Sequence, residues 1–388
     1  MNQKELIEKF EENFGQGEGI RLFFSPGRVN LIGEHTDYNG GHVFPAALSF
    51  GTYAVVRKRH DGLLKFASLN LPAEVTCELE RLTYQDEDDW ANYPKGMIDG
   101  LRAQGLPVGG AEFLFYGNIP NGAGLSSSAS IEVVTAIAMR GLYGGDATNQ
   151  TLAILAQKAE NEFVGVNCGI MDQFAVAMGK KDHAILLDCE TLSYQWVPLL
   201  LKDYELIIAN TNKKRGLADS EYNARRQDCE EALRRVREHE DLESWGALSE
   251  EAFEEVIPWI KDSVLVKRAR HAVTENQRTL QAVQELKRGN LKAFGQLMNA
   301  SHCSLRDDYQ VTGKELDALV EAAWAQPGVI GSRMTGAGFG GCTVSLVEKN
   351  EVQAFMDHVA ERYTKETGLV ADFYRAAIED GARELEIW

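Results

Sequence analysis

The sequence lacks the features that mark nucleic-acid-binding, membrane and exported proteins. Its 388 residues carry a formal net charge of -18, and such an acidic chain repels nucleic acid and anionic membrane surfaces. The most apolar stretch, residues 131–139, is too short to span a bilayer and includes Glu132. The start of the chain is acidic and spaces Leu6, Phe10 and Phe14 on one helical face, unlike a signal peptide. We therefore expect no nucleic-acid or membrane partner and a cytoplasmic location.

Cysteine is also scarce, and several sequence signatures are missing. The six cysteines are scattered, without a C-x-x-C pair or a zinc-type grouping with histidine, so we expect reduced core residues. The Walker A pattern G-x-x-x-x-G-K-[ST] is absent, and so are the signatures of protein kinases. These absences argue against a disulfide scaffold, a zinc module, a P-loop enzyme and a protein kinase.

What is present is a mixed pattern of strands and helices. At roughly 150 residues per domain the length indicates two or three domains, and a hydrophobic content of 44% supports a sizeable core. After residue 200 the pattern turns strongly helical, so we expect an α+β protein with two lobes, residues 1–200 and 201–388. The expected strands are residues 21–24, 52–58, 63–68, 112–116, 184–188, 205–210, 342–347 and 370–374. The expected helices are residues 127–142, 151–163, 220–240, 264–287, 313–325 and 351–364.

The first segment with unusual chemistry is GRVNLIGEHTDYNGG, residues 27–41, which we name the sugar segment. Within ten residues it gathers Arg28, Glu34, His35 and Asp37. A sugar hydroxyl needs both a donor and an acceptor, and carboxylates with an imidazole supply both. The alternative is a solvated loop with an internal Arg–Asp ion pair.

The second segment is NGAGLSSSAS, residues 121–130, ahead of an apolar helical run. Backbone N–H groups at a glycine-rich helix N-terminus form a cradle for anions such as nucleotide phosphates. The alternative is an ordinary N-cap, for which one serine suffices. We name residues 122–128 the phosphate loop.

The third segment is MTGAGFGGC, residues 334–342, whose residues 335–341 we name the glycine turn. It contains G-x-G-x-x-G, but a dinucleotide fingerprint follows a strand and opens a helix, and here the context is reversed. The functional interpretation is a turn whose backbone approaches a ligand, and the alternative is a plain turn joining a helix to a strand.

A fourth feature is Asp172, which lies among the apolar residues Ile170, Met171 and Phe174. An unpaired carboxylate is costly in such surroundings, so we expect Arg28 as its partner. The alternative is a turn or cap residue.

Together these segments resemble the GHMP small-molecule kinases, named for galactokinase, homoserine kinase, mevalonate kinase and phosphomevalonate kinase. GAGLSSSAS and TGAGFGG are shared by that superfamily. GRVNLIGEHTDYNGG looks like the signature of the galactokinase family along its whole length. AENEFVGVNCGIMDQF, residues 159–174, is similar to the catalytic stretch of that family, and NTNKKRGLADSEYNARR, residues 210–226, to a second sugar-contacting region.

The resemblance implies an α+β fold of two lobes with the active site in the cleft between them. The N-terminal lobe is expected to contain a left-handed βαβ crossover, which contradicts the usual right-handed rule and does not follow from the residues themselves. The implied reaction is ATP-dependent phosphorylation of galactose at the anomeric hydroxyl, with Mg²⁺ as cofactor, galactose and ATP as the small-molecule partners, and a monomeric enzyme of galactose catabolism. The alternatives are a kinase for N-acetylgalactosamine or arabinose, and a galactose- and ATP-binding regulator without turnover.

The resemblance also implies a role for particular residues. Asp172 is the expected base with Arg28 beside it, and Ser128 and Glu160 are the expected Mg²⁺ ligands. The expected sugar-binding residues are Glu34, His35, Thr36, Asp37, Gly169 and Tyr222. The expected nucleotide-binding residues are Ser68, Gly122, Ala123, Gly124, Leu125, Ser126, Ser127 and Ser128.

Overall fold

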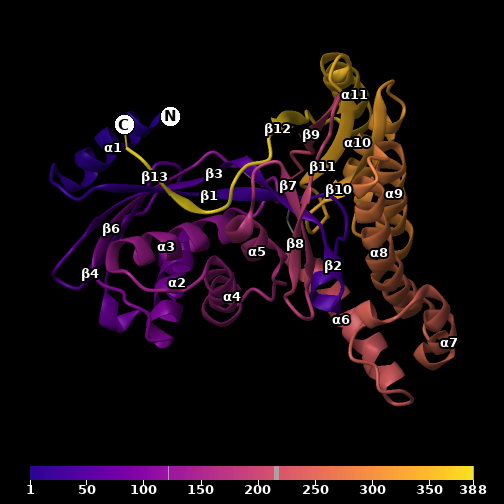
Figure 1. Ribbon diagram of the computed structural model, residues 1–388, viewed down its shortest axis with the longest axis horizontal. Coiled ribbons are helices and arrows are strands. Elements are labelled where there is room, and N and C mark those ends of the chain that lie inside the picture. The colour runs from indigo at the N-terminus through magenta and orange to yellow at the C-terminus, as the bar shows by residue number, and fades with distance from the viewer. Residues whose placement is uncertain (121, 214–217, 388) are drawn as a thin grey trace.

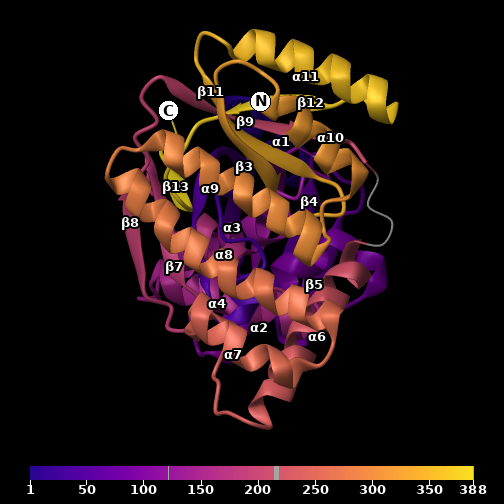
Figure 2. The same ribbon diagram turned by 90° about the vertical axis from the view of Figure 1, so that its right-hand side faces the viewer.

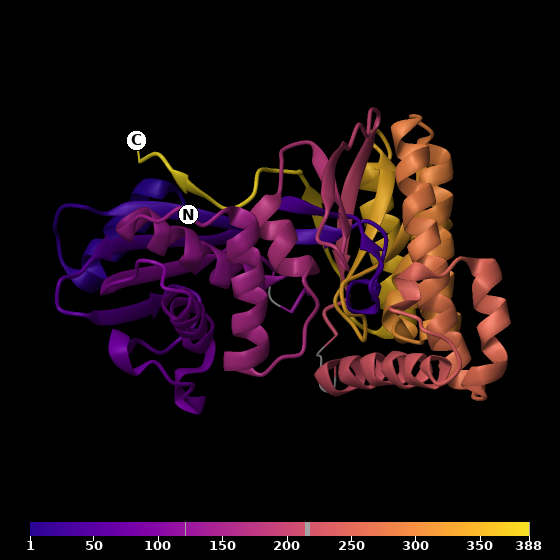
Figure 3. The same cartoon turned by 60° about the horizontal axis from the view of Figure 1, so that its bottom comes forward.

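The computed structural model describes residues 1–120, 122–213 and 218–387, and these residues form three β-sheets covered by helices. Figure 1 shows one sheet with its helices at the left, a second with its helices at the right, and a short sheet where they meet. Figure 3 gives the same division from below, with the indigo and purple half apart from the orange and yellow half.

The first sheet has six strands in the order β13-β1-β3-β6-β4-β5. The bounds are β1 Arg21–Asn30, β3 Pro45–Lys58, β4 Leu63–Ser68, β5 Val75–Glu78, β6 Ala111–Gly117 and β13 Arg383–Leu385. Neighbouring strands are antiparallel except β4 and β6, which run parallel and are connected through β5 and α2. The hand of this crossover stays a prediction.

Both faces of the first sheet are buried, because its side chains alternate between two cores. Phe113 and Phe115 of β6 lie in one core, and Leu114 lies in the other. Helix α1, Gln3–Phe14, covers the Leu114 face with Leu6 and Phe10, as the sequence spacing predicted. The other face carries α2 Asn92–Ala103, α3 Ser127–Tyr143, α4 Asn149–Ala159 and α5 Met171–Met178.

The second sheet has four antiparallel strands in the order β10-β11-β9-β12. The bounds are β9 Tyr204–Asn210, β10 Val329–Thr335, β11 Cys342–Glu348 and β12 Asp372–Ala376. Leu206 and Ile208 of β9 face α8 Ser263–Lys287 and α9 Leu291–Ser304, whereas Ile207 faces α10 Gly313–Trp324 and α11 Val352–Thr367. Figure 2 shows α8 and α9 lying side by side in front of the sheet.

The remaining elements fill the base and the junction of the molecule. Helices α6 Ala218–Arg237 and α7 Glu250–Ile260 pack against one end of α8 around the buried Trp245. The third sheet, in the order β2-β7-β8, consists of β2 His42–Val43, β7 His183–Asp188 and β8 Tyr194–Pro198.

One hydrophobic core joins the two halves directly beneath the segments singled out in the sequence. It contains Val29 and Ile32 of the sugar segment, Leu125 of the phosphate loop, and Ile208 and Val344 of the second sheet. Both segments are therefore fixed to packed secondary structure.

The mixed α+β content and the expected elements are confirmed, with several corrections. The glycine turn joins two strands, because β10 precedes it, and does not join a helix to a strand. Strand β3 begins at Pro45, and the helical pattern of residues 151–163 continues from α4 into a π-helix at Glu160–Val164. Helices α2, α5, α7 and α9 were not expected. Among the described residues, no helix combines the length and apolarity that crossing a bilayer requires.

Candidate active site

The phosphate loop lies directly on strand β1, and a glycine makes this approach possible. The pairing of β1 with β3 shifts register between Pro26 and Arg28, and a Cβ on Gly27 would lie 2.6 Å from the carbonyl oxygen of Leu125. The backbone N–H of Arg28 donates to that same carbonyl at 3.2 Å. Gly27 therefore allows the sugar segment and the phosphate loop to meet.

Arg28 joins the phosphate loop to Asp172. Its Nε donates to Oδ1 of Asp172 at 2.9 Å and its Nη2 to Oδ2 at 3.1 Å, while Nη1 donates to the carbonyl oxygen of Gly124 at 2.7 Å. The arginine side chain is 4% exposed and the aspartate side chain 30%. The expected pairing is confirmed, and it is a two-pronged charge-assisted contact that orients the carboxylate toward open space.

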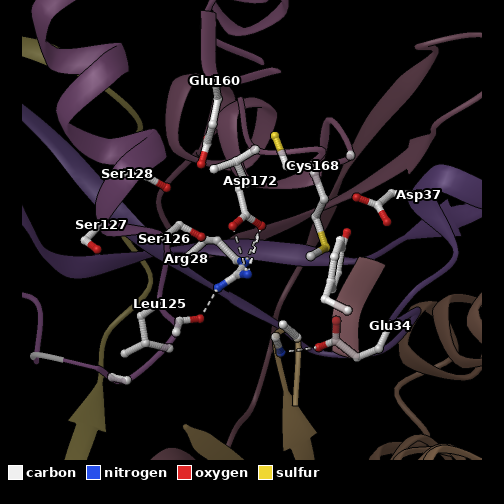
Figure 4. A pocket seen from close by; sticks show the side chains of 18 of the residues that line it. Arg28, Glu34, Asp37, Leu125, Ser126, Ser127, Ser128, Glu160, Cys168 and Asp172 are labelled. Atoms are coloured by element: carbon white, nitrogen blue, oxygen red, sulfur yellow. Dashed lines mark hydrogen bonds and ion pairs between the residues drawn. The ribbon is translucent and has the colours of Figure 1, made fainter. Parts of the chain in front are cut away.

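A cavity of about 300 Å³ opens above this pair. Figure 4 shows the phosphate-loop serines, Glu160, Asp172, Asp37 and Glu34 arranged around it. The cavity is lined by Arg28, Glu34, His35, Asp37, residues 122–128, Glu160, Gly169, Asp172, Tyr222, Gly336 and Ala337, among others. Nearly all the residues predicted for the site are thus brought to one place from six separate stretches of the chain.

The phosphate loop has the backbone shape of an anion cradle. The angle φ is positive at Gly122, Gly124 and Ser126 and not at the residues between them, an alternation that turns successive N–H groups toward one side. Ser126 occupies the N-cap position of α3, but its side chain makes no capping hydrogen bond. Its buried hydroxyl has no hydrogen-bond partner in the described part of the chain. The ordinary N-cap interpretation therefore does not account for these serines.

In the sugar segment, His35 is fully engaged by the protein. Its Nε2–H donates to the carbonyl oxygen of Ala337 at 3.2 Å, and its Nδ1 accepts from the hydroxyl of Tyr38 at 2.7 Å. Burial, with a smaller contribution from the neighbouring His271, lowers the pKa of His35 to about 3, so the ring is neutral. His35 presents its ring to the cavity, and its Nε2 connects the sugar segment to the glycine turn.

Asp37 and Gly169 lie against each other on the far side of the cavity. A Cβ on Gly169 would lie 1.8 Å from Oδ2 of Asp37, so only glycine fits at that position. Burial and then the nearby Asp172 raise the pKa of Asp37 to about 6. Within the described part of the chain no ion pair reaches this carboxylate, which close to neutral pH is suited to accept hydroxyl hydrogen bonds.

Of the predicted sugar-binding residues Tyr222 and Thr36, only Tyr222 lines the cavity. Tyr222 lines the cavity, with its ring centroid 5.6 Å from that of His35. Thr36 does not line it, because its hydroxyl is directed to the carbonyl oxygens of Gly33 and His42 at 2.9 and 2.7 Å. Thr36 therefore shapes the sugar segment from behind. Residues 214–217 of the second predicted sugar region lie outside the described residues.

Glu160 and Ser128 form the oxygen-rich end of the cavity. The Ser128 hydroxyl hydrogen-bonds the Glu160 carboxylate, and Gln173 donates to Oε2 of Glu160 at 2.6 Å. Burial and then Asp172 raise the pKa of Glu160 to about 7, and burial and then Glu160 raise the pKa of Glu132 well above its usual value. The end of the cavity thus holds crowded carboxyl groups.

This chemistry fits Mg²⁺, which prefers carboxylate and hydroxyl oxygens together with phosphates and waters. The buried carboxyl group of Glu132 lies directly against Glu160 and Gln173, so a bound cation would have acidic groups on this side of the cavity. Within residues 1–120, 122–213 and 218–387, no three His, Cys, Asp or Glu side chains could by themselves hold a metal ion. A metal here would take its remaining ligands from a nucleotide.

A second cavity of about 210 Å³ adjoins the phosphate loop, and most of it was missed in the sequence. It shares Ser127 and Ser128 with the first cavity and includes the predicted Ser68. Its other walls are largely apolar and aromatic, namely Leu71, Trp90, Tyr93, Phe115, Ile119 and Ile131, with Thr52, Asn70 and Gly117. A flat, mostly apolar ring attached to phosphates fits this shape. Aromatic residues scattered over three elements carry no spacing signal that could have revealed it.

The glycine turn closes the cavity from the second half of the molecule. The N–H of Gly336 donates to Oε1 of Glu34 at 2.8 Å, and a Cβ on Gly336 would lie 3.0 Å from the carbonyl oxygen of Gly124. The turn therefore touches both the sugar segment and the phosphate loop, which supports its functional interpretation.

Comparisons with known proteins agree with this arrangement. Three family models match the chain: the galactokinase galactose-binding signature over residues 8–58, the GHMP kinases N terminal domain over residues 92–180, and the GHMP kinases C terminal domain over residues 282–365. The chain is 55% identical over 385 residues to a galactokinase from Fusobacterium nucleatum, covering 98% of this chain and 99% of that protein. It is 52% identical to a galactokinase from Bacillus subtilis, covering 99% of each.

Solved structures give the same result. The crystal structure of Lactococcus lactis galactokinase complexed with galactose superposes with a TM-score of 0.97 at 48% identity, covering 98% of this chain and 99% of that one. A mevalonate kinase from Methanococcus jannaschii, at 17% identity and a TM-score of 0.66 over 94% of this chain and all of its own, shares the fold. The chain belongs to the galactokinase family of the GHMP kinases.

Proposed function

We propose that this protein transfers the γ-phosphoryl group of ATP to the anomeric hydroxyl of galactose, giving galactose 1-phosphate and ADP. The observation that carries the proposal is the Arg28–Asp172 pair at the point where the sugar segment meets the phosphate loop. A carboxylate there can face both a sugar hydroxyl and a terminal phosphate.

Asp172 orients the attacking hydroxyl and accepts its proton, a role worth about 10²–10⁴-fold in rate. The transition state spreads negative charge over the phosphoryl oxygens, so most of the catalysis consists of positioning and charge neutralisation. Arg28 and the N–H groups of residues 122–128 supply the fixed positive charge and dipoles for this.

The sugar is held between the two halves of the molecule. Glu34 and Asp37 accept hydrogen bonds from hydroxyl groups, and Gly169 and Tyr222 complete the wall. His35 contributes its ring, and Thr36 supports the segment from beneath.

The nucleotide lies across both cavities. Its base and ribose occupy the cavity lined by Ser68, Trp90 and Tyr93, and its phosphates lie on residues 122–128. Ser128 and Glu160 hold Mg²⁺, which neutralises phosphate charge when bound.

We further propose a monomeric cytoplasmic enzyme with a lobe boundary near residue 200. The boundary is supported by the end of β8 at Pro198 and the start of the second sheet at Tyr204. The segment β13 then returns to pair with β1 of the first lobe.

The test is turnover of ATP with a panel of hexoses and pentoses, followed by phosphorus NMR of the product. We expect galactose as the substrate and an acid-labile 1-phosphate as the product. A 6-phosphate would overturn the assignment of the hydroxyl. Faster turnover of N-acetylgalactosamine or arabinose would change the substrate, and binding of galactose and ATP without turnover would identify a regulator.

A further inference from the structure

Arg333 of strand β10 is a fully buried cation that touches the sugar segment from the second half of the molecule. Its side chain is 0% exposed. Its Nη1 donates to the carbonyl oxygen of Asn30 at 3.0 Å and to Oε1 of Glu34 at 3.2 Å, and its Nε donates to the hydroxyl of Ser301 at 3.2 Å. The guanidinium thus connects β1, the sugar segment and α9.

These contacts occupy one oxygen of Glu34 and leave the other free. Oε1 also accepts from the N–H of Gly336 at 2.8 Å, so it has two donors from the protein. No hydrogen bond from the described residues reaches Oε2. Glu34 lines the cavity, as Figure 4 shows, so the free oxygen is the one available to a ligand.

A second buried carboxylate holds Arg333 in place. Oε1 of Glu275 on α8 accepts from the hydroxyl of Ser301 at 2.5 Å and from the N–H of Gly33 at 2.9 Å, and Arg278 pairs with its Oε2. Burial raises the pKa of Glu275, but Arg278 and the other cations outweigh it and hold the pKa at about 2. Charges therefore alternate from Arg278 through Glu275 and Arg333 to Glu34, with no net charge.

Stability alone does not account for this arrangement. Apolar side chains of similar volume often stabilise a core as well as a buried ion pair does or better, because both charges must be removed from water. Nη2 of Arg333 is buried and has no hydrogen-bond partner in the part of the chain that the structure describes, which adds to the cost. The arrangement is explained if Arg333 must fix the direction of Glu34.

We propose that Arg333 is a positioning residue for sugar recognition, which binds Oε1 of Glu34 so that Oε2 is presented to the hydroxyl groups of the hexose. Ser301 and Glu275 in turn position Arg333. The proposal rests on the proposed function, since it assigns Glu34 to the galactose site.

The test is Arg333→Lys, which keeps the charge but cannot reach Asn30, Glu34 and Ser301 together. We expect the Kd for galactose, measured by calorimetry on the full chain, to rise about tenfold or more. The KM for galactose rises with it, whereas kcat at saturating sugar and the KM for ATP stay within about twofold, because binding geometry and not chemistry is lost.

A double-mutant cycle shows whether the effect passes through Glu34. Glu34→Gln weakens galactose binding by itself, and adding Arg333→Lys should then change the Kd by less than about twofold. Full additivity of the two losses would overturn the proposal. So would a Kd that stays at the wild-type value in the single variant.

Arg57→Lys is the matched control, because Arg57 also holds several partners at once, namely Glu112 at 2.9 Å and the carbonyl oxygen of Phe14 at 2.8 Å, far from the cavity. It should lower the melting temperature without changing the Kd for galactose.

If Arg333→Lys does not fold, Ser301→Ala removes only the hydroxyl shared by Arg333 and Glu275, and its Kd decides the matter in the same way. Wild-type protein that binds no galactose would overturn the proposed function, whereas wild-type binding with an unchanged variant overturns this inference alone.

Discussion

In the sugar segment, most polar side chains have hydrogen-bond partners within the protein. In the phosphate loop and the carboxyl groups beside it, fewer polar side chains have partners or counter-charges among the described residues. In the sugar segment, Thr36 and both nitrogens of His35 have partners, and so does one oxygen of Glu34. On the nucleotide side, the Ser126 hydroxyl has no hydrogen-bond partner among the described residues, and burial raises the pKa values of the neighbouring Glu132 and Glu160 carboxyl groups. The two regions meet only 2.7 Å apart, where Arg28 donates to the carbonyl oxygen of Gly124.

This difference indicates how each site is completed. Rigid hydrogen bonds keep the sugar site in its binding shape before the ligand arrives, which lowers the entropic cost of binding. The nucleotide side instead contains an anion cradle next to crowded carboxyl groups. The cradle takes up phosphate and the carboxyl groups take up a cation, so both are neutralised only when a nucleotide binds together with a metal ion. We therefore expect changes in the sugar segment to alter affinity for galactose, and changes on the other side to alter metal dependence and rate.

The largest effect is expected at Asp172, which belongs to both regions. Asp172→Asn keeps the size of the side chain and removes the charge and the ability to accept a proton. We expect kcat to fall by about 10²–10⁴-fold while galactose still binds and the melting temperature changes little or rises. The measurements are kcat, galactose affinity and a melting curve on the same preparation. A folded, galactose-binding variant whose kcat lies within about threefold of wild type would show that another group is the base.

The next largest effect tests the nucleotide side alone. Glu160→Gln should raise the Mg²⁺ concentration needed for half-maximal activity by about 10–100-fold and leave galactose binding unchanged. The pKa of Glu160 in the folded protein, about 7, lies above its ordinary value of 4.5, so the ligand-free fold loses stability as the pH rises from about 4.5 to 7, and the loss is complete at pH 8. The variant should therefore melt at or above the wild-type temperature at pH 8.

The control for this variant lies two residues further along the same π-helix. Glu162 has a side chain 68% exposed that pairs with Lys158 at 3.7 Å. Glu162→Gln should leave the Mg²⁺ titration curve unchanged. If Glu160→Gln gives that same unchanged curve, Glu160 is not a metal ligand.

A smaller effect is expected from pH on the sugar side. Asp37 must be ionised to accept hydrogen bonds from hydroxyl groups, and its pKa in the ligand-free protein is about 6. Galactose affinity should therefore be constant above pH 7 and fall by about tenfold for each unit below pH 6. Asp37→Asn should bind weakly with no such dependence. Wild-type affinity that is equal at pH 5 and pH 7.5 would show that the Asp37 carboxylate does not bind the sugar.

The sequence predicted the parts of the site that are contiguous in the chain. The residues of the sugar segment and the phosphate loop lie within fifteen and seven consecutive positions, so their unusual composition is visible without a structure. The pairing of Arg28 with Asp172 was also accessible, because a carboxylate among apolar neighbours needs a cation.

Residues that reach the site from ordinary amphipathic elements were not predicted. Arg333 and Glu275 look like surface charges in the sequence, since burial of a polar residue in a strand or helix leaves no local signal. Strand β10 was missed for a related reason: Gly331, Ser332 and Arg333 interrupt its apolar pattern, and only pairing with β11 makes it a strand.

The smallest effect is expected when one hydroxyl is removed from each region and the free energy of unfolding is measured. Thr36 is fully buried and its hydroxyl lies 2.9 and 2.7 Å from the two carbonyl oxygens, of Gly33 and His42. Thr36→Val keeps the shape and leaves those carbonyls without their donor, so the free energy of unfolding should fall by about 1 kcal/mol. Ser126→Ala removes a buried hydroxyl without a partner among the described residues, so we expect no loss in that free energy.

Both variants are compared with wild type by calorimetric melting without ligands and again with saturating ATP and Mg²⁺. Thr36→Val should melt below wild type by the same interval under both conditions, because its hydroxyl acts within the protein. Ser126→Ala should melt at the wild-type temperature without ligands and below it when nucleotide is present. The variant lacks a hydroxyl that binds phosphate, so the nucleotide stabilises it less. If the two variants lose the same melting temperature without ligands, the Ser126 hydroxyl has a stabilising partner within the protein, as the Thr36 hydroxyl does. The contrast between the two regions would then be wrong.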